Sequence, residues 1–497
     1  MERKTSFFWG VATSAYQAEG GYNGPGEPRT NWAVAEERGD VIPLGKSADF
    51  LNHYEQDFAL CRSLGLNAFR LGIEWSRLQP QAGASLDEAA LETYAQVLAA
   101  CRDAGLEPVL TLHHFTHPEW LGPDPWLGEE IIPLFTGFVI GALGWLNHRL
   151  AALGHSPVQW LITINEPNML VLNSYFGRQF PARARGGFAT SLRAYDSLIA
   201  AHVRAYHAIH QLYQENGWAR PQVTVNNYCS DLYWSDKFLL DLLAIRERGI
   251  ADQNLASYLY QKSTEFDLAF HAARIPLRKT LTWLFGALVK RVSKVLGRMT
   301  FGKAHFPLAL REIADGPTPR TFDYIGLDYY DPFAAHAFRI PVWWDHEFKS
   351  KSFHAWIMAS ITSKWWDWRV LAPGLHFFCT YYSADLHGRE VLIAENGMAI
   401  RRKWSNRETR RRDRVTRSQF LEMHVAEVRR ICAEGCPLIG YLHWSLFDNY
   451  EWGSYTPRFG LYALDFGSGT ERQARSPDGD SPAETYARLI AKDADPD

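Results

Sequence analysis

Eight short apolar segments recur along the chain, and most are separated by stretches whose apolar residues follow helical spacing. Uninterrupted apolar runs of this length are typical of strands buried on both faces of a parallel sheet. The predicted strands are residues 7–17, 68–75, 107–114, 159–167, 222–229, 323–330, 391–397 and 438–447, and the predicted helices include 48–65, 85–105, 133–154 and 189–217. Eight strand–helix units in one chain predict an α/β protein, a (β/α)₈ TIM barrel whose site lies at the carboxyl ends of the strands.

The helix at 85–105 is expected to begin with Ser85 as its N-cap and Glu88 completing a capping box. No repeat and no flexible linker divides the sequence, so residues 1–497 are predicted to form a single domain. Two intervals, about 231–320 and 331–390, are longer than a barrel requires and are expected to be loop and helix insertions over its carboxyl face.

Two predicted strands end in a carboxylate beside an amide. One reads Ile164-Asn165-Glu166-Pro167 and the other Ile393-Ala394-Glu395-Asn396-Gly397. A charge at the end of a buried strand is costly unless a partner or a chemical role stabilises it. Paired carboxylates at one rim of a barrel suit glycoside hydrolysis, with one acting as the acid and the other as the nucleophile or base. Arg70, within the apolar run 68–73, is the natural cation to keep the nucleophile ionised.

Composition excludes several other classes of function. A net charge of −3 gives no reason to expect nucleic acid as a partner, and the six scattered cysteines indicate neither a disulfide framework nor zinc. His113, His114 and His117 form a cluster without an acidic ligand at matching spacing, so one histidine in contact with a ligand and two structural ones are expected, with no metal and no cofactor. The amino-terminal residues lack signal-peptide architecture, which predicts a cytoplasmic protein.

Three segments raise the question of membrane contact or of charged ligands. The apolar run 131–146 is shorter than a membrane span and contains three glycines, so it is not expected to cross a bilayer. Residues 274–301 are basic and amphipathic; we expect their apolar stripe to pack inward, with a membrane surface or another partner as the alternative. The basic run 401–417 is expected to be a solvated loop, with contact to an acidic leaving group left open.

From residue 7 to about 465 the sequence resembles glycoside hydrolase family 1, the β-glucosidase family. The motifs that carry the resemblance lie at residues 8–20, 74–77, 163–168, 393–397 and 458–460, and the longest is Trp444-Ser445-Leu446-Phe447-Asp448-Asn449-Tyr450-Glu451-Trp452. The resemblance implies a retaining exo-β-glycosidase acting on small β-glucosides, and on β-galactosides or β-fucosides as further options. The natural aglycone and the oligomeric state are left open.

The resemblance also implies roles for individual residues. Glu166 would be the acid/base and Glu395 the nucleophile, with Arg70 supporting it. The residues implied to bind the substrate are Gln17, His114, Asn165, Tyr330, Trp368, Trp444, Glu451 and Trp452. Among these, Asn165 would bind the 2-hydroxyl, Tyr330 would donate to the nucleophile, and Trp368 falls where the family places an aglycone platform.

Three positions and one stretch depart from the family pattern. Asp328 replaces the usual Asn, Ala394 replaces Thr, Phe115 stands where Trp is common, and the stretch 451–455 is one residue shorter than the commonest form. Asp328 could compete with Glu395 for Arg70 or raise the pKa of the nucleophile. These departures put the outer-hydroxyl specificity in question.

Two alternatives remain open. In a 6-phospho-β-glycosidase, a Ser with nearby Lys and Tyr replaces the acidic residue at the position of Glu451, and a carboxylate there would repel a phosphate. A non-catalytic sugar-binding relative would lack at least one of Glu166 and Glu395, and both are present.

Overall fold

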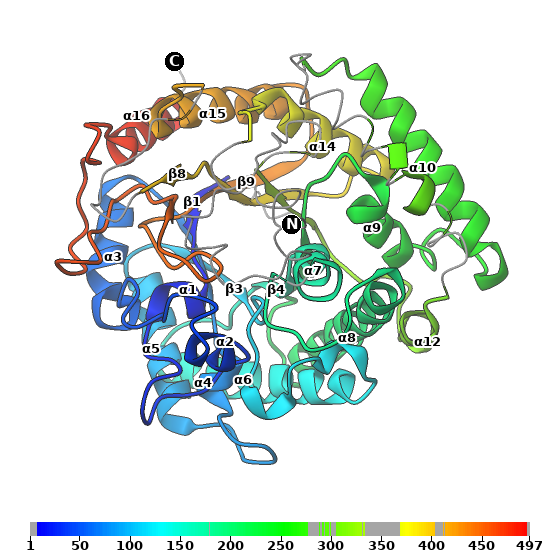
Figure 1. Ribbon diagram of the computed structural model, residues 1–497, viewed down its shortest axis with the longest axis horizontal. Helices are drawn as coiled ribbons and strands as arrows, with labels where there is room; N and C mark the ends of the chain where they lie inside the picture. The colour runs from blue at the N-terminus through cyan, green and yellow to red at the C-terminus, as the bar shows by residue number, and fades with distance from the viewer. Residues whose placement is uncertain are drawn as a thin grey trace.

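Eight parallel strands close into a barrel in the computed structural model of the chain (Figure 1). The structure describes residues 7–494 except 178, 277–287, 289–290, 293, 298, 300–304, 331, 333–367, 403–410 and 412. The barrel strands are β1 (Phe8–Ala12), β2 (Ala68–Gly72), β3 (Glu107–Thr111), β4 (Trp160–Asn165), β5 (Gln222–Tyr228), β6 (Ile325–Tyr329), β7 (Val391–Asn396) and β9 (Leu438–Trp444). Each strand pairs with the next along the chain, and β9 closes the ring by pairing with β1 from Phe8–Gly440 to Ala12–Trp444. The predicted TIM barrel is therefore confirmed.

Helices surround this barrel on its outside (Figure 1). They include α3 (Phe50–Ser63), α5 (Glu88–Asp103), α6 (Ile131–Ala152), α8 (Phe188–Glu215), α12 (Pro307–Asp315), α14 (Ala372–Asp385), α15 (Arg417–Ala433) and α16 (Pro482–Ala494). Shorter helices follow the carboxyl ends of strands: α1 (Ala15–Glu19), α4 (Trp75–Leu78), α7 (Pro167–Val171) and α9 (Lys237–Leu243). A small antiparallel pair, β8 (Ile400–Arg401) with β10 (Pro457–Arg458), lies outside the barrel.

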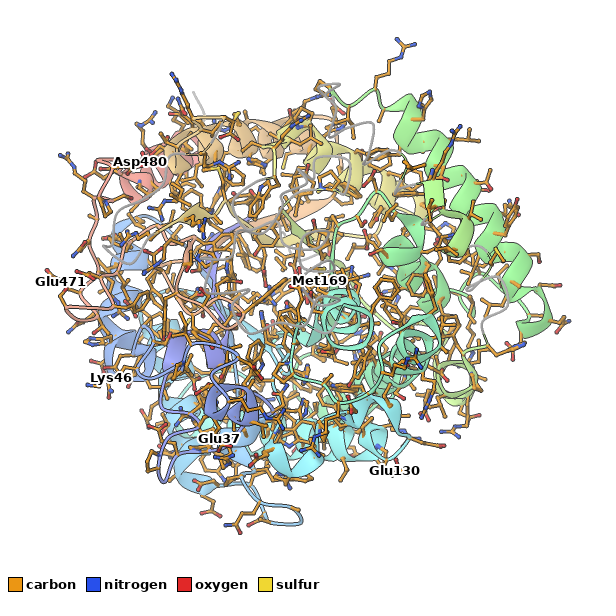
Figure 2. All side chains as sticks on the ribbon, viewed as in Figure 1. Glu37, Lys46, Glu130, Met169, Glu471 and Asp480 are labelled. Atoms are coloured by element: carbon orange, nitrogen blue, oxygen red, sulfur yellow. The ribbon has the colours of Figure 1, made fainter. Side chains whose placement is uncertain are left out.

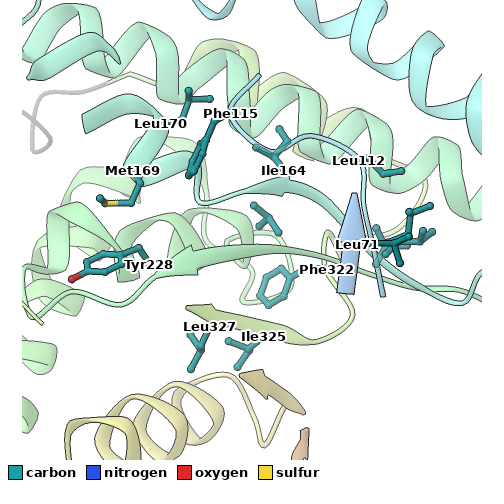
Figure 3. Close-up of a cluster of buried hydrophobic side chains, with 14 of the residues drawn as sticks. Leu71, Leu112, Phe115, Ile164, Met169, Leu170, Tyr228, Phe322, Ile325 and Leu327 are labelled. Carbon is teal, nitrogen blue, oxygen red and sulfur yellow. The ribbon is translucent and has the colours of Figure 1, made fainter. Parts of the chain in front are cut away.

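Apolar side chains fill both the barrel and the layer between strands and helices. Every residue of β2, β4, β6, β7 and β9 is buried, which explains their continuous apolar sequence. Figure 3 shows part of the outer layer, where Ile164, Ile325 and Leu327 lie among side chains of neighbouring elements. Glu471 and Asp480 are labelled at the edge of the molecule in Figure 2, whereas Met169 is labelled near its centre.

The first strand is shorter than the sequence pattern indicates. Residues 7–17 were expected as one strand, but β1 ends at Ala12 and the helix α1 then carries Gln17. The strand pairing ends there: the last backbone hydrogen bond to β2 is donated by the Thr13 amide to the Arg70 carbonyl at 2.8 Å. Beyond the rim no strand supplies partners, and the chain turns into a helix instead.

The predicted cap of the second long helix is also wrong. Asp87, not Ser85, is the N-cap of α5, and its side chain accepts a hydrogen bond from the Ala90 backbone amide at 2.8 Å. Glu88 is the first residue of the helix, where an acidic group favours the positive end of the helix dipole. Asp is as good a cap as Ser, and its position decides where the helix starts.

Within the described part of the chain, α6 is the helix whose length and composition would suit a membrane span. It has 22 residues and continues to Ala152, beyond the apolar run 131–146, so the expectation that this segment is too short for a span is wrong. Half of the most apolar part of this helix is buried in the protein. The helix packs between α5 and α8 in the outer layer of the barrel. Its apolar character is that of a core helix.

The long intervals are described in part. Between β5 and β6 the chain forms α9, α10 (Leu255–Ala272) and α12, and α10 lies at the outer edge of the molecule (Figure 1). Of the interval 331–390, residues 331 and 333–367 lie outside the described residues. So do residues 403–410 and 412 of the basic run 401–417. In the basic segment 274–301, the described Leu288 is exposed and not packed inward as expected.

Candidate active site

Both strand-end glutamates face one cavity at the carboxyl end of the barrel. Glu166 follows β4 with a left-handed backbone (φ 38°, ψ 61°), a conformation that costs about 1–3 kcal/mol for a residue other than glycine. Pro167 begins α7 immediately after it, and Glu395 lies near the end of β7. One carboxyl oxygen of Glu166 and one of Glu395 lie within 4.8 Å of each other, although the residues are far apart in sequence. The structure therefore brings the predicted pair together.

Arg70 and Tyr330 hold the Glu395 carboxylate from two sides. Arg70 Nη1 donates to Oε1 at 2.6 Å, and the Tyr330 hydroxyl donates to Oε2 at 2.6 Å. Burial raises the pKa of Glu395, while Arg70 and then the Tyr330 hydrogen bond lower it. Burial also raises the pKa of the Tyr330 hydroxyl well above its ordinary value, so the phenol keeps the proton that it donates. These two donors stabilise the ionised form of Glu395.

Asn165 lies behind the cavity wall and links three strands. Its Oδ1 accepts from Arg70 Nη2 at 2.5 Å and from Asn226 Nδ2 at 2.9 Å, and its Nδ2 lies 3.2 Å from His114 Nε2. Burial, and then the Arg70 cation, lower the pKa of His114 well below its ordinary value. His114 is therefore a neutral ring, stacked at 5.8 Å against Trp444.

A third carboxyl, Asp328, lies in the same group. It is fully buried; its Oδ2 accepts from Asn226 Nδ2, and its Oδ1 is 3.8 Å from Arg70 Nη1. Burial and then the neighbouring Glu395 raise the pKa of Asp328 well above its ordinary value. Arg70 thus faces two carboxyls, and the shorter contact is with Glu395.

Gln17 and Glu451 form the part of the cavity that follows the neighbouring strands β1 and β9. Gln17 Nε2 donates to Glu451 Oε2 at 3.1 Å and to the Tyr450 carbonyl at 2.9 Å, and Ser14 Oγ donates to Gln17 Oε1 at 2.7 Å. Burial, and then Glu395, raise the pKa of Glu451 well above its ordinary value. A buried acceptor of this kind is suited to binding neutral hydroxyl groups.

The cavity opens to solvent, and the space between its walls, the open part included, is about 430 Å³. Its lining residues are Gln17, His114, Phe115, Glu166, Met169, Tyr228, Tyr330, Trp368, Glu395, Trp444, Glu451, Trp452 and Phe459. Every predicted site residue is in this lining except Asn165 and Arg70, which stand behind it. The mixture of aromatic and polar groups in this lining fits a small sugar-like ligand.

The aromatic walls come from several loops. Trp452 meets Phe115 and Phe180 edge to face at 6.0 and 5.0 Å, and Trp368 is stacked on Phe459 at 6.2 Å. Arg411, in the basic run 401–417, donates to the Trp368 carbonyl at 2.7 Å and pairs with Asp413. This arginine therefore supports the Trp368 wall, and its charge is already compensated.

Sequence reasoning assigned no role to Met169, Tyr228 or Phe459. Figure 3 shows Met169 and Tyr228 close to the end of β5, on the side of the barrel where the cavity lies. Met169 follows Glu166 by three residues on α7, and Phe459 belongs to a motif that was noted without a role. Their closeness in sequence to a strand-end glutamate or a family motif is the signal from which a place in the cavity could have been predicted.

The other two histidines of the cluster are buried structural residues. His113 packs edge to face on Trp126 at 5.1 Å, and burial lowers its pKa to about 3. His117 Nε2 bonds the Gly122 carbonyl at 3.0 Å, and burial lowers its pKa to about 4. Neither is in the cavity lining, so the predicted division into one cavity histidine and two structural ones agrees with the geometry.

Comparisons with known proteins agree with this architecture. 6-phospho-beta-galactosidase 1 of Streptococcus pneumoniae is 26% identical over 482 residues, which cover 93% of each chain. The cytosolic beta-glucosidase of Cavia porcellus is 26% identical over 499 residues, covering 97% of this chain and 96% of that protein. Among solved structures, the beta-glucosidase from Thermotoga maritima in complex with castanospermine has a TM-score of 0.66 at 19% identity, with 100% of this chain and 99% of that one covered. The beta-glycosidase from Pyrococcus horikoshii has a TM-score of 0.62 at 22% identity, covering 99% and 97%.

The family assignment comes from a match over most of the sequence. The model of glycosyl hydrolase family 1 matches residues 2–228 and 310–493, which include all eight barrel strands and both glutamates. This chain is a glycoside hydrolase and belongs to glycosyl hydrolase family 1.

Proposed function

We propose that the protein is a retaining exo-β-glycosidase of small β-glucosides, acting through a covalent glycosyl-enzyme. The observation that carries the proposal is the approach of Glu166 and Glu395 carboxyl oxygens to within 4.8 Å. Retaining enzymes hold their carboxyls about 5–5.5 Å apart, whereas inverting enzymes leave about 6.5–9.5 Å for a water molecule. A nearest approach of the carboxyl oxygens within 4.8 Å supports the retaining spacing over the inverting one.

The two steps use the groups already described. In the first, the Glu395 carboxylate forms a bond to the anomeric carbon while the Glu166 carboxyl gives its proton to the departing glycosidic oxygen. In the second, the Glu166 carboxylate takes a proton from water, whose oxygen bonds the anomeric carbon and releases Glu395. Tyr330 and Arg70 orient the nucleophile through their two 2.6 Å hydrogen bonds.

The remaining residues bind the sugar in this proposal. Asn165 and His114 serve the side of the 2-hydroxyl, Gln17 and Glu451 accept and donate at the outer hydroxyls, and Trp444 and Trp452 pack on the ring. Trp368 lies at the aglycone end. Aromatic faces suit the C–H side of a sugar and paired polar groups suit its hydroxyls.

Stereochemistry and covalent labelling test the mechanism. An aryl 2-deoxy-2-fluoro-β-glucoside should inactivate the enzyme and leave one sugar on the peptide that contains Glu395, and the first product of a normal substrate should be the β-anomer by NMR. The Glu395→Gln variant serves as the matched control and should take up no label. Label on another residue, or an α-anomer as first product, would exclude the mechanism.

A neutral sugar, not a 6-phosphate, is the substrate that the cavity favours. Several relatives are named 6-phospho-beta-galactosidases, so the distinction matters. Among the described residues that line the cavity there is no Lys or Arg, and Glu451 lies where the outer hydroxyls are expected. A phosphate there would lie without a cationic partner in a cavity that already holds the ionised Glu395, and like-charge contacts of this kind cost several kcal/mol.

Paired substrates separate the two hypotheses. The kcat/KM for p-nitrophenyl β-glucoside should exceed that for its 6-phosphate by about 10³-fold, which corresponds to several kcal/mol of like-charge cost. Glu451→Ser should lower the value for the neutral substrate and narrow the gap, while Glu451→Gln keeps the size of the side chain and isolates the effect of charge. A wild-type enzyme that prefers the phosphorylated substrate would contradict this assignment.

The name of the Cavia porcellus relative supports a cytoplasmic location, as proposed from the sequence.

A further inference from the structure

A stretch after α10 contacts the rest of the protein through its described residues Lys294 and Gly297. The described residues of this stretch, 288, 291–292, 294–297 and 299, are all helical. Lys294 Nζ pairs with Asp267 Oδ2 of α10 at 2.7 Å. A Cβ atom on Gly297 would lie 2.6 Å from the ring of Trp234, so the helix backbone packs directly against that indole. Lys294 and Gly297 therefore mark its inner side.

The opposite side of the stretch is apolar and exposed. Leu288, Val292, Val295 and Met299 follow one another at intervals of four, three and four residues, which places them on one side of a helix. Their exposed fractions are 57%, 49%, 56% and 64%. Val295 and Gly297 are two positions apart, or about 200° around the helix, so this side points away from Trp234. We call these four residues the apolar face.

The sequence around the apolar face is strongly basic. Residues 274–303 contain eight Lys or Arg and no Asp or Glu: Arg274, Arg278, Lys279, Lys290, Arg291, Lys294, Arg298 and Lys303. In the described part, Arg274 and Arg291 are exposed, and Arg291 is adjacent to Val292. An exposed apolar stripe bordered by cations is the combination by which amphipathic helices bind anionic lipid.

The apolar face lies on the same side of the barrel as the catalytic pair. Trp234 belongs to the short helix η4 (Tyr233–Ser235), which follows the carboxyl end of β5. The Ser235 carbonyl accepts from Asn168 Nδ2 at 3.0 Å, and Asn168 comes two residues after Glu166. The family model matches residues 2–228 and 310–493, so this surface falls in the interval between the two matched parts.

We propose that the apolar face, with the exposed Arg291 beside it, docks on an anionic lipid surface. The apolar side chains would enter the boundary between headgroups and acyl chains, and Arg291 would contact the negative headgroups. Docking in this way places a membrane beside the rim of the barrel that carries the cavity. The proposal concerns a binding surface and does not depend on the reaction proposed above.

Vesicle flotation of the full-length chain tests this docking. With vesicles of phosphatidylglycerol and phosphatidylcholine the protein should float at about 50 mM NaCl, and raising the salt to about 500 mM should reduce the bound fraction, because screening weakens contacts to headgroups. The Val292→Asp/Val295→Asp variant should lower the bound fraction about tenfold, since it puts charge at the lipid boundary. Leu134→Asp, on α6 at a residue that is 44% exposed, is the matched control and should bind like the wild type.

Hydrolysis of a soluble aryl glycoside should be unchanged in all three proteins, which shows that the variants are folded and separates this test from that of the reaction. Absence of flotation of the wild type, or equal flotation of wild type and double variant, would overturn the proposal. Light scattering that shows a dimer lost in the double variant, without vesicle binding by the wild type, would overturn it in favour of a second copy of the chain.

Discussion

Replacement of Asp328 by Asn tests how one arginine serves two carboxyls. Glu395 receives hydrogen bonds from Arg70 and Tyr330 at 2.6 Å each, whereas Asp328 receives one from Asn226 and lies 3.8 Å from Arg70. The better-supported anion is Glu395, and burial with the neighbouring Glu395 raises the pKa of Asp328. We therefore expect Asp328 to be a neutral acid when Glu395 is ionised.

The size of the effect follows from the spacing. Oxygens of the two carboxyls lie within 4.8 Å. Two charges at this distance repel by about 3.5 kcal/mol at an effective dielectric constant of 20, which is about 2.5 pKa units. If Asp328 were ionised in the wild type, its replacement by a neutral amide would lower the pKa of Glu395 by about this amount. If Asp328 is protonated, as we expect, the replacement changes no charge and the pKa should move by less than about 0.5 units.

The rate of inactivation by 2,4-dinitrophenyl 2-deoxy-2-fluoro-β-glucoside, measured against pH, reports this pKa directly. The reaction needs an ionised Glu395 and, with so good a leaving group, no proton from Glu166. The acid limbs of the two pH–rate profiles, for wild type and Asp328→Asn, should nearly coincide. The oxygen of the new amide can still accept the hydrogen bond from Asn226, so the local structure is kept. A limb displaced downward by about 2.5 units would refute the neutral-acid assignment.

Unfolding gives a second measure of the same group. Between the unfolded pKa of about 3.9 and its raised folded value, Asp328 binds more protons in the folded state than in the unfolded one, so stability falls as pH rises through this window. The Asp328→Asn variant has no titratable group at this position, so its stability does not fall for this reason as pH rises. The difference in unfolding free energy, variant minus wild type, should therefore grow from pH 4 upward in urea titrations. A difference independent of pH would contradict a raised pKa.

Other parts of the structure give further expectations. Glu166→Ala should slow substrates with poor leaving groups about 10²–10⁴-fold more than activated aryl glycosides, and azide should restore turnover as a β-glycosyl azide; equal losses on both would exclude Glu166 as the acid. Tyr330→Phe removes a donor that lowers the pKa of Glu395, so the acid limb should move to higher pH and kcat/KM should fall about 10–150-fold; an unmoved limb would argue against this contact. Lys237 Nζ is buried and lies 2.6 Å from both Asp241 and Asp385, so Lys237→Ala should lower the free energy of unfolding in urea by about 3–5 kcal/mol. Arg29→Ala, which removes exposed ion pairs, should lower it by less than about 1 kcal/mol. Similar losses in the two variants would show that burial does not decide the contribution of an ion pair.

The barrel and its catalytic pair could be predicted because their sequence signals are local. Strands buried on both faces require uninterrupted apolar runs, and all eight runs became barrel strands. Glu166 and Glu395 stand out because each ends such a run. Parallel strands in a barrel share one carboxyl rim, so the meeting of the two side chains follows from topology alone.

Features that depend on distant partners could not be predicted in the same way. The end of β1 is set by where β2 stops pairing, and Gln17 gains its position from Glu451 and Tyr450, which follow the neighbouring strand β9 but are far away in sequence. Met169 and Phe459 are apolar, and the sequence alone does not show whether an apolar residue lines a cavity or packs in the core. The pKa of Asp328 likewise depends on burial and on Glu395, a neighbour from another strand.

The charges around the cavity connect these observations with substrate choice. Glu166, Asp328, Glu395 and Glu451 are all buried, and the described guanidinium among them, Arg70, is already bonded to Glu395 and Asn165. His114 adds no charge, because burial and Arg70 keep its ring neutral. A site with four carboxyls and one engaged cation can ionise only part of them, and a phosphate would add further negative charge without a partner. A neutral sugar adds none, and its hydroxyls can donate to the carboxylates and accept from protonated carboxyls, so the electrostatics of the whole group favour the unphosphorylated glycoside.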